Sequence, residues 1–317
     1  MNEAILTRDL VKRYGPGRAL DGFTLAVPFG ATLGLVGRNG AGKTTWMMTV
    51  AGLVRPDSGT INLLGRGPFD AAVHSGRVSI LPQDSELPLE ASVRELLVRF
   101  ARLQRMSLAV ARMAADQLLA EFNLTDKADC PVRGLSHGMR KRAMVAQAFI
   151  GEPQVVLLDE PLSGLDPAEA ERLRSFVRAR RGRTTVVISS HQLDDIERLC
   201  THVAFVEKGR VERMETLAAL TTQSGRIVYA LARKPEEFLT DGVDGAWDAE
   251  RNELTVRFDA CRSVEDVNAE LLPRLIGFGV RSVNAGRSLE EAYLELSYVS
   301  APRLASSTFD KINWVAD

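Results

Sequence analysis

The sequence predicts an α/β protein built around a mostly parallel sheet, with a helical insertion and a second, smaller α/β unit toward the C-terminus. Short apolar runs that end abruptly in polar residues recur in the first part of the chain. They are TLGLV (32–36), VSILP (78–82), QVVLLDEP (154–161) and TTVVISSH (184–191). Such runs are typical of strands that are buried on both faces of a parallel sheet.

The composition changes to helix-forming residues between Glu86 and Ile150. Three amphipathic segments predict helices here: VRELLVRFARLQ (93–104), SLAVARMAADQLLAEF (107–122) and MRKRAMVAQAFI (139–150). Because predicted strands flank this interval, we interpret residues from about 86 to 150 as a helical insertion in the sheet domain.

The pattern changes again after about Thr222. Strand, strand, helix, strand and helix are predicted, in that order, by IVYALA (227–232), ELTVRF (253–258), SVEDVNAELLPRLIGFG (263–279), VRSVNA (280–285) and SLEEAYLEL (288–296). A turn is expected at WDAERN (247–252). We therefore predict a main domain over 1–222, a small α/β domain over 223–299 and a tail over 300–317 without an interpretable motif.

Charge and composition exclude several classes of function. Forty basic and 41 acidic residues give a net charge of −1, so the overall charge indicates neither nucleic acid nor an anionic membrane as a partner. The widely spaced Cys130, Cys200 and Cys261 suggest reduced thiols in a cytosolic protein. The chain begins with no secretory-signal pattern and has no run of about 18 apolar residues. If it serves a membrane process, another chain is expected to cross the bilayer.

The strongest motif is GRNGAGKT at 37–44, which lies between a predicted strand and a predicted helix. Glycines allow the backbone to approach a phosphate, amides can point at it, and the helix N-terminus adds a positive end. Lys43 is expected to place its charge on β- and γ-phosphate oxygens, and Thr44 to ligate Mg²⁺. A glycine-rich turn without a ligand is the competing interpretation. The nucleotide-binding residues predicted from this stretch are Gly37, Arg38, Asn39, Gly40, Ala41, Gly42, Lys43, Thr44 and Thr45.

Two adjacent carboxylates, Asp159 and Glu160, end the apolar run QVVLL. The carboxyl edge of a parallel sheet is where ligands bind in such folds, so both should reach the phosphate loop. Asp159 is expected to hold Mg²⁺, and Glu160 to act as the general base that orients the attacking water. Alone, this pair would be a solvated loop start; beside the phosphate loop it indicates catalysis.

With these motifs, the chain resembles the nucleotide-binding subunit of an ATP-binding cassette (ABC) transporter over residues 1–222. VKRYG carries Tyr14, ILPQDSEL carries Gln83, LSHGM (135–139) stands where the family has LSGGQ, and SGLD (163–166) and His191 follow in the family's order. The resemblance implies a P-loop NTPase cassette, with an antiparallel β subdomain beside the parallel core, that binds and hydrolyses ATP with Mg²⁺.

The resemblance also implies roles for single residues. Tyr14 would stack on adenine, Gln83 would reach Mg²⁺ and the attacking water, and His191 would sense the γ-phosphate. The catalytic residues are then Glu160, His191, Gln83 and Lys43, the Mg²⁺ ligands are Thr44, Gln83 and Asp159, and further nucleotide contacts come from Ser136, His137, Gly138 and Asp166.

The signature LSHGM implies partners, because in the family it completes the ATP site of a second subunit. A head-to-tail dimer with a second copy, or with a homologous cassette, would enclose two ATP molecules. Ser136 fits a helix cap, and a first-turn residue such as His137 can offer its amide without being glycine. Met139 replaces a glutamine and removes a hydrogen-bonding side chain.

The variant signature and the extra C-terminal domain resemble those of ABC-2 and multidrug exporter ATPases. This implies a peripheral protein on the cytoplasmic face of a membrane, with separately encoded integral-membrane permease subunits as partners and no nucleic acid.

Three other classes of function are alternatives. A soluble cassette ATPase that acts on ribosomes or DNA usually has two cassettes or a long coiled coil, and neither is present. A kinase or GTPase would leave the signature unexplained, and no guanine-reading NKxD occurs. Glu160 argues against a non-hydrolysing regulator.

The cluster RARRGR (178–183) is interpreted as a solvated helix end, with phosphate or lipid contact as the alternative.

Overall fold

The computed structural model describes residues 3–222, 226–235, 243–258, 262–285 and 289. The main sheet lies within residues 3–222 and has six strands. The strand order is β5 (Val78–Leu81), β6 (Val155–Asp159), β7 (Thr185–Ser190), β3 (Thr32–Val36), β8 (His202–Glu207) and β9 (Arg210–Thr216). All neighbours are parallel except β8 and β9. Every residue of β3, β6 and β7 is buried, which confirms the prediction from their apolar runs.

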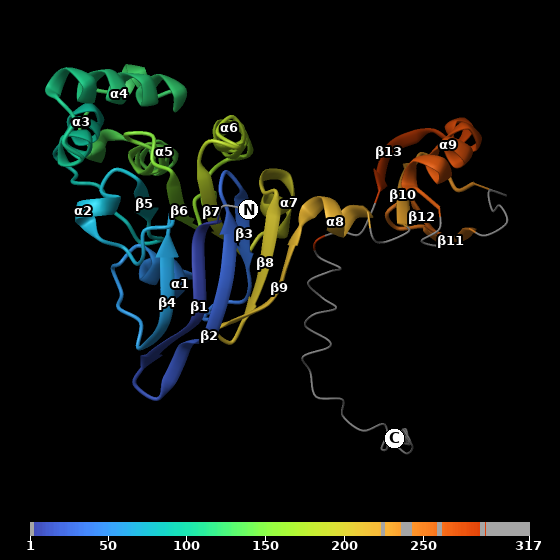
Figure 1. Cartoon of the computed structure of the whole chain (residues 1–317). Coiled ribbons are helices and arrows are strands. Elements are labelled where there is room, and N and C mark those ends of the chain that lie inside the picture. The colour runs from blue at the N-terminus through green and yellow to red at the C-terminus, as the bar shows by residue number, and fades with distance from the viewer. Residues whose placement is uncertain (1–2, 223–225, 236–242, 259–261, 286–288, 290–317) are drawn as a thin grey trace, which may run out of the picture.

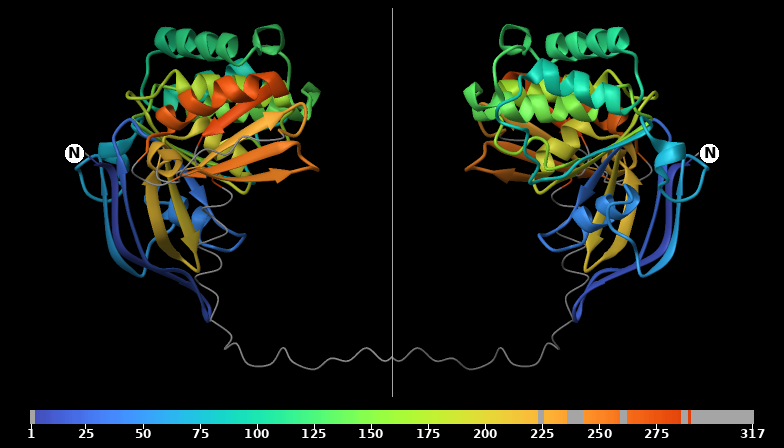
Figure 2. Two further views of the ribbon diagram at one scale, coloured as in Figure 1. Left: turned by 90° about the vertical axis from the view of Figure 1, so that its right-hand side faces the viewer. Right: turned by 90° about the vertical axis from the view of Figure 1, so that its left-hand side faces the viewer.

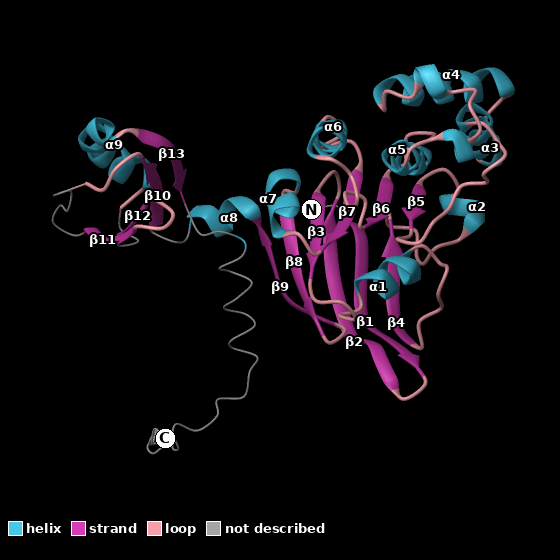
Figure 3. Ribbon diagram, turned by 180° about the vertical axis from the view of Figure 1, so that it is seen from behind, coloured by secondary structure: helices cyan, strands magenta, loops and turns pink. Residues whose placement is uncertain are grey.

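A three-stranded antiparallel sheet covers one face of the main sheet. Its order is β2 (Gly17–Pro28), β1 (Glu3–Tyr14) and β4 (Ser58–Leu63). Side chains of α1 (Lys43–Val50) pack in the core between the two sheets. Among them, Trp46 is fully buried and stacks on Phe23, with 5.6 Å between the ring centroids. Figure 3 shows α1 within this layer. The packing of Trp46 fixes the helix that follows the phosphate loop.

The helical insertion lies at the end of the molecule opposite the tip of the β1–β2 hairpin, as Figures 1 and 2 show. Its helices are α3 (Val93–Leu103), α4 (Leu108–Glu121) and α5 (His137–Ala148), close to the predicted ranges. Serines cap all three, and Ser92 forms a full capping box with Glu95. The remaining α-helices of the main unit are α2 (Ala71–His74), α6 (Pro167–Arg178), α7 (Leu193–Leu199) and α8 (Leu217–Thr222).

The smaller unit has its own core and stands beyond α8 in Figure 1. Its antiparallel sheet has the order β11 (Val243–Asp248), β12 (Glu253–Phe258), β10 (Arg226–Leu231) and β13 (Val280–Ala285), and α9 (Val264–Leu275) packs against β10. The sequence did not predict β11, because we took its last two residues as part of a turn. The predicted helix at 288–296 lies outside the described residues except for Leu289, and the domain boundaries stay a prediction.

None of the helices in the described ranges combines the length and the apolar character needed to span a bilayer.

Candidate nucleotide-binding site

The phosphate loop joins β3 to α1, and two of its glycines are required by close backbone approach. A Cβ atom at Gly37 would lie 2.3 Å from the Val206 carbonyl oxygen. At Gly42 the backbone has φ +108°, and a Cβ atom would lie 2.4 Å from the Ala19 carbonyl oxygen. Larger residues would therefore have to push neighbouring backbone aside, and the loop owes its tight curvature to these positions.

Lys43 is the first residue of α1 and its side chain is held inside the loop. It is 7% exposed, and its Nζ donates to the carbonyl oxygens of Gly37 at 2.7 Å and Arg38 at 3.3 Å. Burial lowers the pKa of Lys43, and the charges of Glu160 and Asp159 oppose that fall. No side chain caps α1 and its first turn has no acidic residue, so this helix start favours an anion.

Asp159 and Glu160 reach the same edge as the loop, as the parallel topology predicts. The Thr44 hydroxyl donates to Asp159 Oδ2 at 2.6 Å, and the Ser189 hydroxyl donates to Asp159 Oδ1. The Glu160 amide donates to Ser189 Oγ at 2.9 Å. Ser189 thus ties the two carboxylate residues together from β7. Ser189 is not among the site residues predicted from the sequence, although the change from apolar to polar residues in VVISS marks its position.

Glu160 and His191 meet at the exposed rim of this edge. The carboxylate Oε2 of Glu160 lies 3.0 Å from His191 Nδ1, and the side chains are 11% and 56% exposed respectively. Glu160 has φ +50°, in the left-handed region that non-glycine residues adopt at a cost. The contact supports the expectation that strand ends deliver Glu160 and His191 to one place.

A cavity of about 270 Å³ opens between the loop and the carboxylates. Its walls are formed by Ala19, Asn39, Gly40, Ala41, Gly42, Lys43, Thr44, Thr45, Gln83, Asp159 and Glu160. A hydroxyl, a carboxylate and an amide oxygen come from Thr44, Asp159 and Gln83, and such hard oxygen donors suit Mg²⁺. The residues present therefore fit the metal that the motif predicts.

Other predicted site residues lie away from this cavity. Tyr14 is 54% exposed at the end of β1, with Lys12 Nζ 5.6 Å from its ring centroid. Asp166 caps α6 by accepting from the Glu169 amide at 2.8 Å. Neither residue is among the cavity walls, so their nucleotide contacts stay predictions.

The signature residues also lie outside the cavity walls, at the exposed start of α5. Ser136 caps the helix and accepts from the Met139 amide at 3.2 Å. A Cβ atom on Gly138 would lie 2.2 Å from a Glu169 carboxylate oxygen, and one on Gly164 would lie 2.8 Å from His137 Nε2. The signature therefore packs against the SGLD loop and α6 of its own chain.

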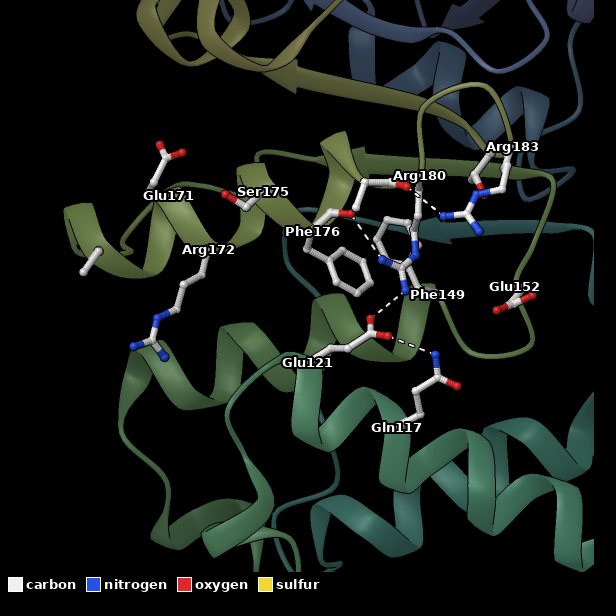
Figure 4. Close-up of a pocket in the computed structure, with 13 residues that line it drawn as sticks. Gln117, Glu121, Phe149, Glu152, Glu171, Arg172, Ser175, Phe176, Arg180 and Arg183 are labelled. Atoms are coloured by element: carbon white, nitrogen blue, oxygen red, sulfur yellow. Dashed lines mark hydrogen bonds and ion pairs between the residues drawn. The ribbon is translucent and has the colours of Figure 1, made fainter.

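A larger cavity of about 870 Å³ lies where α4, α5 and α6 meet, away from the phosphate loop (Figure 4). Arg180 crosses it, with its guanidinium 3.5 Å from the Phe176 ring centroid and an ion pair to Glu121 at 2.6 Å. The RARRGR cluster is thus only partly the solvated helix end that we expected, because Arg180 joins the helical insertion to α6.

Comparisons with known proteins agree with this geometry. The family model described as "ABC transporter" matches residues 20–163. Nod factor export ATP-binding protein I of Burkholderia orbicola is 35% identical over 297 residues, covering 92% of this chain and 95% of the relative. The daunorubicin resistance ATP-binding protein DrrA3 of Streptomyces coeruleorubidus is 38% identical over 224 residues, covering 70% and 71%.

Solved structures give the same result. The ATP-binding subunit of an ABC transporter matches with a TM-score of 0.62 and 28% identity, covering 68% of this chain and 91% of the other. A nucleotide-free ATP-binding cassette matches with a TM-score of 0.59 at 21% identity, which shows the fold alone. Motifs, fold and a relative matched over 92% of this chain lead to one conclusion: the chain belongs to the ATP-binding, ATP-hydrolysing subunits of ABC transporters.

Proposed function

We propose that this chain drives export by hydrolysing ATP for separately encoded integral-membrane permease subunits, at the cytoplasmic face of a membrane. The observation that carries the proposal is the joint presence of the phosphate loop, Asp159 and Glu160 around one cavity, in a chain whose relatives include Nod factor export ATP-binding protein I. Because the transported molecule passes through the partner chains, residues described here do not select it.

Glu160 is the base in the proposed reaction. Its carboxylate accepts the proton of the attacking water, and His191 orients that carboxylate at 3.0 Å. Lys43 stabilises charge on the transferred phosphate, and the free amides of the α1 first turn do the same. Thr44, Asp159 and Gln83 would hold Mg²⁺, which when bound would reduce the negative charge on the phosphate oxygens.

A second copy completes each site in this proposal. Ser136 and His137 are exposed and outside their own chain's cavity, which supports a contact with the nucleotide of a partner. Two chains placed head to tail would then enclose two ATP molecules, and a single chain would bind ATP while hydrolysing it poorly.

The proposal is tested with Glu160→Gln, which removes the base while keeping the size of the side chain. The variant is expected to bind ATP like the wild type, to lose roughly 10²–10⁴-fold in turnover and to accumulate as an ATP-dependent dimer. Turnover is measured by phosphate release, and the dimer by light scattering with and without ATP. Normal turnover in this variant would remove Glu160 from the role of base.

Partner identity needs a separate experiment. Purification of the wild-type chain from native membranes in mild detergent should recover an integral-membrane chain, with an ATP-free preparation as the control. Recovery of ribosomes or DNA instead would contradict the transport proposal and favour the soluble cassette ATPases.

A further inference from the structure

Helix α6 carries a carboxylate that lies against the start of α5, the helix beside it in Figure 1. A methyl group added at Gly138 would overlap the carboxylate of Glu169, so the two residues are in close contact. Gly138 is in the first turn of α5, where backbone amides have no carbonyl partner within the helix. A negative charge therefore stands next to the residues that we propose bind the nucleotide of a partner.

Arg142, one turn further along α5, holds this carboxylate. Its Nη2 lies 3.1 Å from Glu169 Oε1, and the side chains of Arg142 and Glu169 are 9% and 19% exposed. Arg142 Nη1 also donates to the carbonyl oxygens of Phe122 at 2.8 Å and Asn123 at 3.2 Å, at the end of α4. The guanidinium is thus fixed by backbone atoms as well as by Glu169.

The two members of this ion pair have opposite effects on an anion at the α5 start. The helix dipole favours an anion there, whereas the Glu169 carboxylate repels it. Arg142 offsets that repulsion, because it places a positive charge within ion-pair distance of the carboxylate. Since both side chains are mostly buried, water and salt weaken their charges less than those of a surface pair.

We propose that Glu169 and Arg142 set how strongly the signature binds a phosphate of a partner's ATP, and with it the ATP concentration at which two chains close. Glu169 opposes closure, and Arg142 limits that opposition. The inference rests on the proposed function, in which two copies enclose ATP between a phosphate loop and a signature. It extends that function to two residues that lie outside the walls of their own chain's nucleotide cavity.

A purely structural ion pair would behave differently. If the pair served only to hold α5 against α6, loss of either partner would loosen the α5 start and weaken closure. Control by charge gives effects of opposite sign: closure becomes easier without the Glu169 carboxylate and harder without the Arg142 guanidinium. The sign of each effect therefore separates the two roles.

The test uses full-length chains that carry Glu160→Gln, because that variant is expected to retain ATP and accumulate as a dimer. Into this parent are introduced Glu169→Gln, Arg142→Gln, both changes together, or the control Glu171→Gln. Glu171 is an exposed carboxylate on the same helix, where it pairs with two arginines of α6 itself. The control thus removes one negative charge and two ion pairs without removing the contact with α5.

Light scattering at increasing ATP concentration gives the midpoint of dimer formation. We expect Glu169→Gln to lower this midpoint about threefold, Arg142→Gln to raise it about threefold, and Glu171→Gln to leave it unchanged. The rise caused by Arg142→Gln should be smaller in the double variant, because the charge that Arg142 offsets is already gone. ATP binding by single chains, measured with a fluorescent analogue at low protein concentration, should be equal in all of them.

Arg142→Gln also removes two bonds to the end of α4, so thermal unfolding is measured for every chain. If the arginine variant does not fold, Glu169→Gln alone decides the proposal. An unchanged or raised midpoint in Glu169→Gln overturns it, and so does an equal fall in Glu171→Gln, which would make the effect one of net charge. A parent chain that forms no ATP-dependent dimer would instead contradict the proposed function itself.

Discussion

Two helix starts, those of α1 and α5, belong to the predicted ATP machinery and are built in opposite ways. The α1 start has a glycine cap, Gly42, with left-handed backbone and no side-chain bond to the first turn. The α5 start has a serine cap, Ser136, whose side chain already accepts one first-turn amide. The carboxylate of Glu169 also lies against Gly138 of α5, where it disfavours a second anion.

The two helix starts therefore differ in whether they can bind a phosphate without a second subunit. Helix α1 is open to a phosphate of its own chain, and its shape is fixed by backbone atoms. Helix α5 is partly satisfied by its own side chains, and Glu169 is itself paired with Arg142 at 3.1 Å. A phosphate can therefore bind at the α5 start only if its binding free energy exceeds the cost of displacing the Ser136 hydroxyl and the Glu169 carboxylate. Such a requirement suits a site that is completed only when two subunits close.

The largest effect is expected from Gly42→Ala. The backbone of Gly42 is in the left-handed region, and a methyl group there would clash with the backbone oxygen of Ala19. Relieving the clash requires a shift of the backbone at Gly42 or at Ala19, and either shift costs free energy. We expect ATP binding to be lost and the free energy of unfolding to fall by about 2 kcal/mol or more. Titration with a fluorescent ATP analogue and urea unfolding measure both effects.

The matched control for that variant is Gly40→Ala in the same loop. Gly40 also has positive φ, +80°, but a Cβ atom there would have no neighbour within 4 Å. Only the backbone cost of ~1–2 kcal/mol is expected, so the free energy of unfolding should fall less than in Gly42→Ala. Equal effects of the two substitutions would contradict the importance of the Ala19 contact.

An intermediate effect is expected from Ser136→Ala. Loss of the cap should lower the free energy of unfolding by ~1 kcal/mol and reduce ATPase activity, because the α5 start loses its hydroxyl and its order. Ser107→Ala is the control, since Ser107 caps α4 in the same manner by accepting from Val110 at 3.3 Å. Both variants should lose similar stability in urea unfolding, and only Ser136→Ala should lose activity. Equal activities would reduce LSHGM to an ordinary helix start.

The smallest effect is expected from His137→Gly. The His137 ring fills space beside Gly164, but it is exposed and has ordinary helical backbone. A glycine in the first turn costs at most ~1 kcal/mol and leaves the amide in place. ATPase assays should show less loss than with Ser136→Ala. A larger loss would show that the imidazole, rather than the amide, is the functional group.

Local sequence patterns predicted the elements that position the site. The apolar runs of β3, β6 and β7 end where the structure ends them, and Ser136 caps the helix that MRKRAMVAQAFI predicts. Such features depend on neighbours in the sequence and on burial, so a single sequence contains them.

Features that depend on tertiary contact could not be predicted in this way. Strand β11 contains Asp244 and Gly245, which have poor strand propensity, and as an edge strand it is held by pairing with β12. The bonds of Ser189 join residues 29 and 30 positions apart, and Arg180 meets Glu121 across 59 positions.

The backbone of Glu160 has a consequence for protein engineering. Glycine or asparagine would adopt φ +50° more easily than glutamate, so replacement there could raise the melting temperature while abolishing turnover. A screen for heat resistance alone would favour such inactive chains. Thermostable versions of this protein should therefore be selected with ATP turnover as a second criterion.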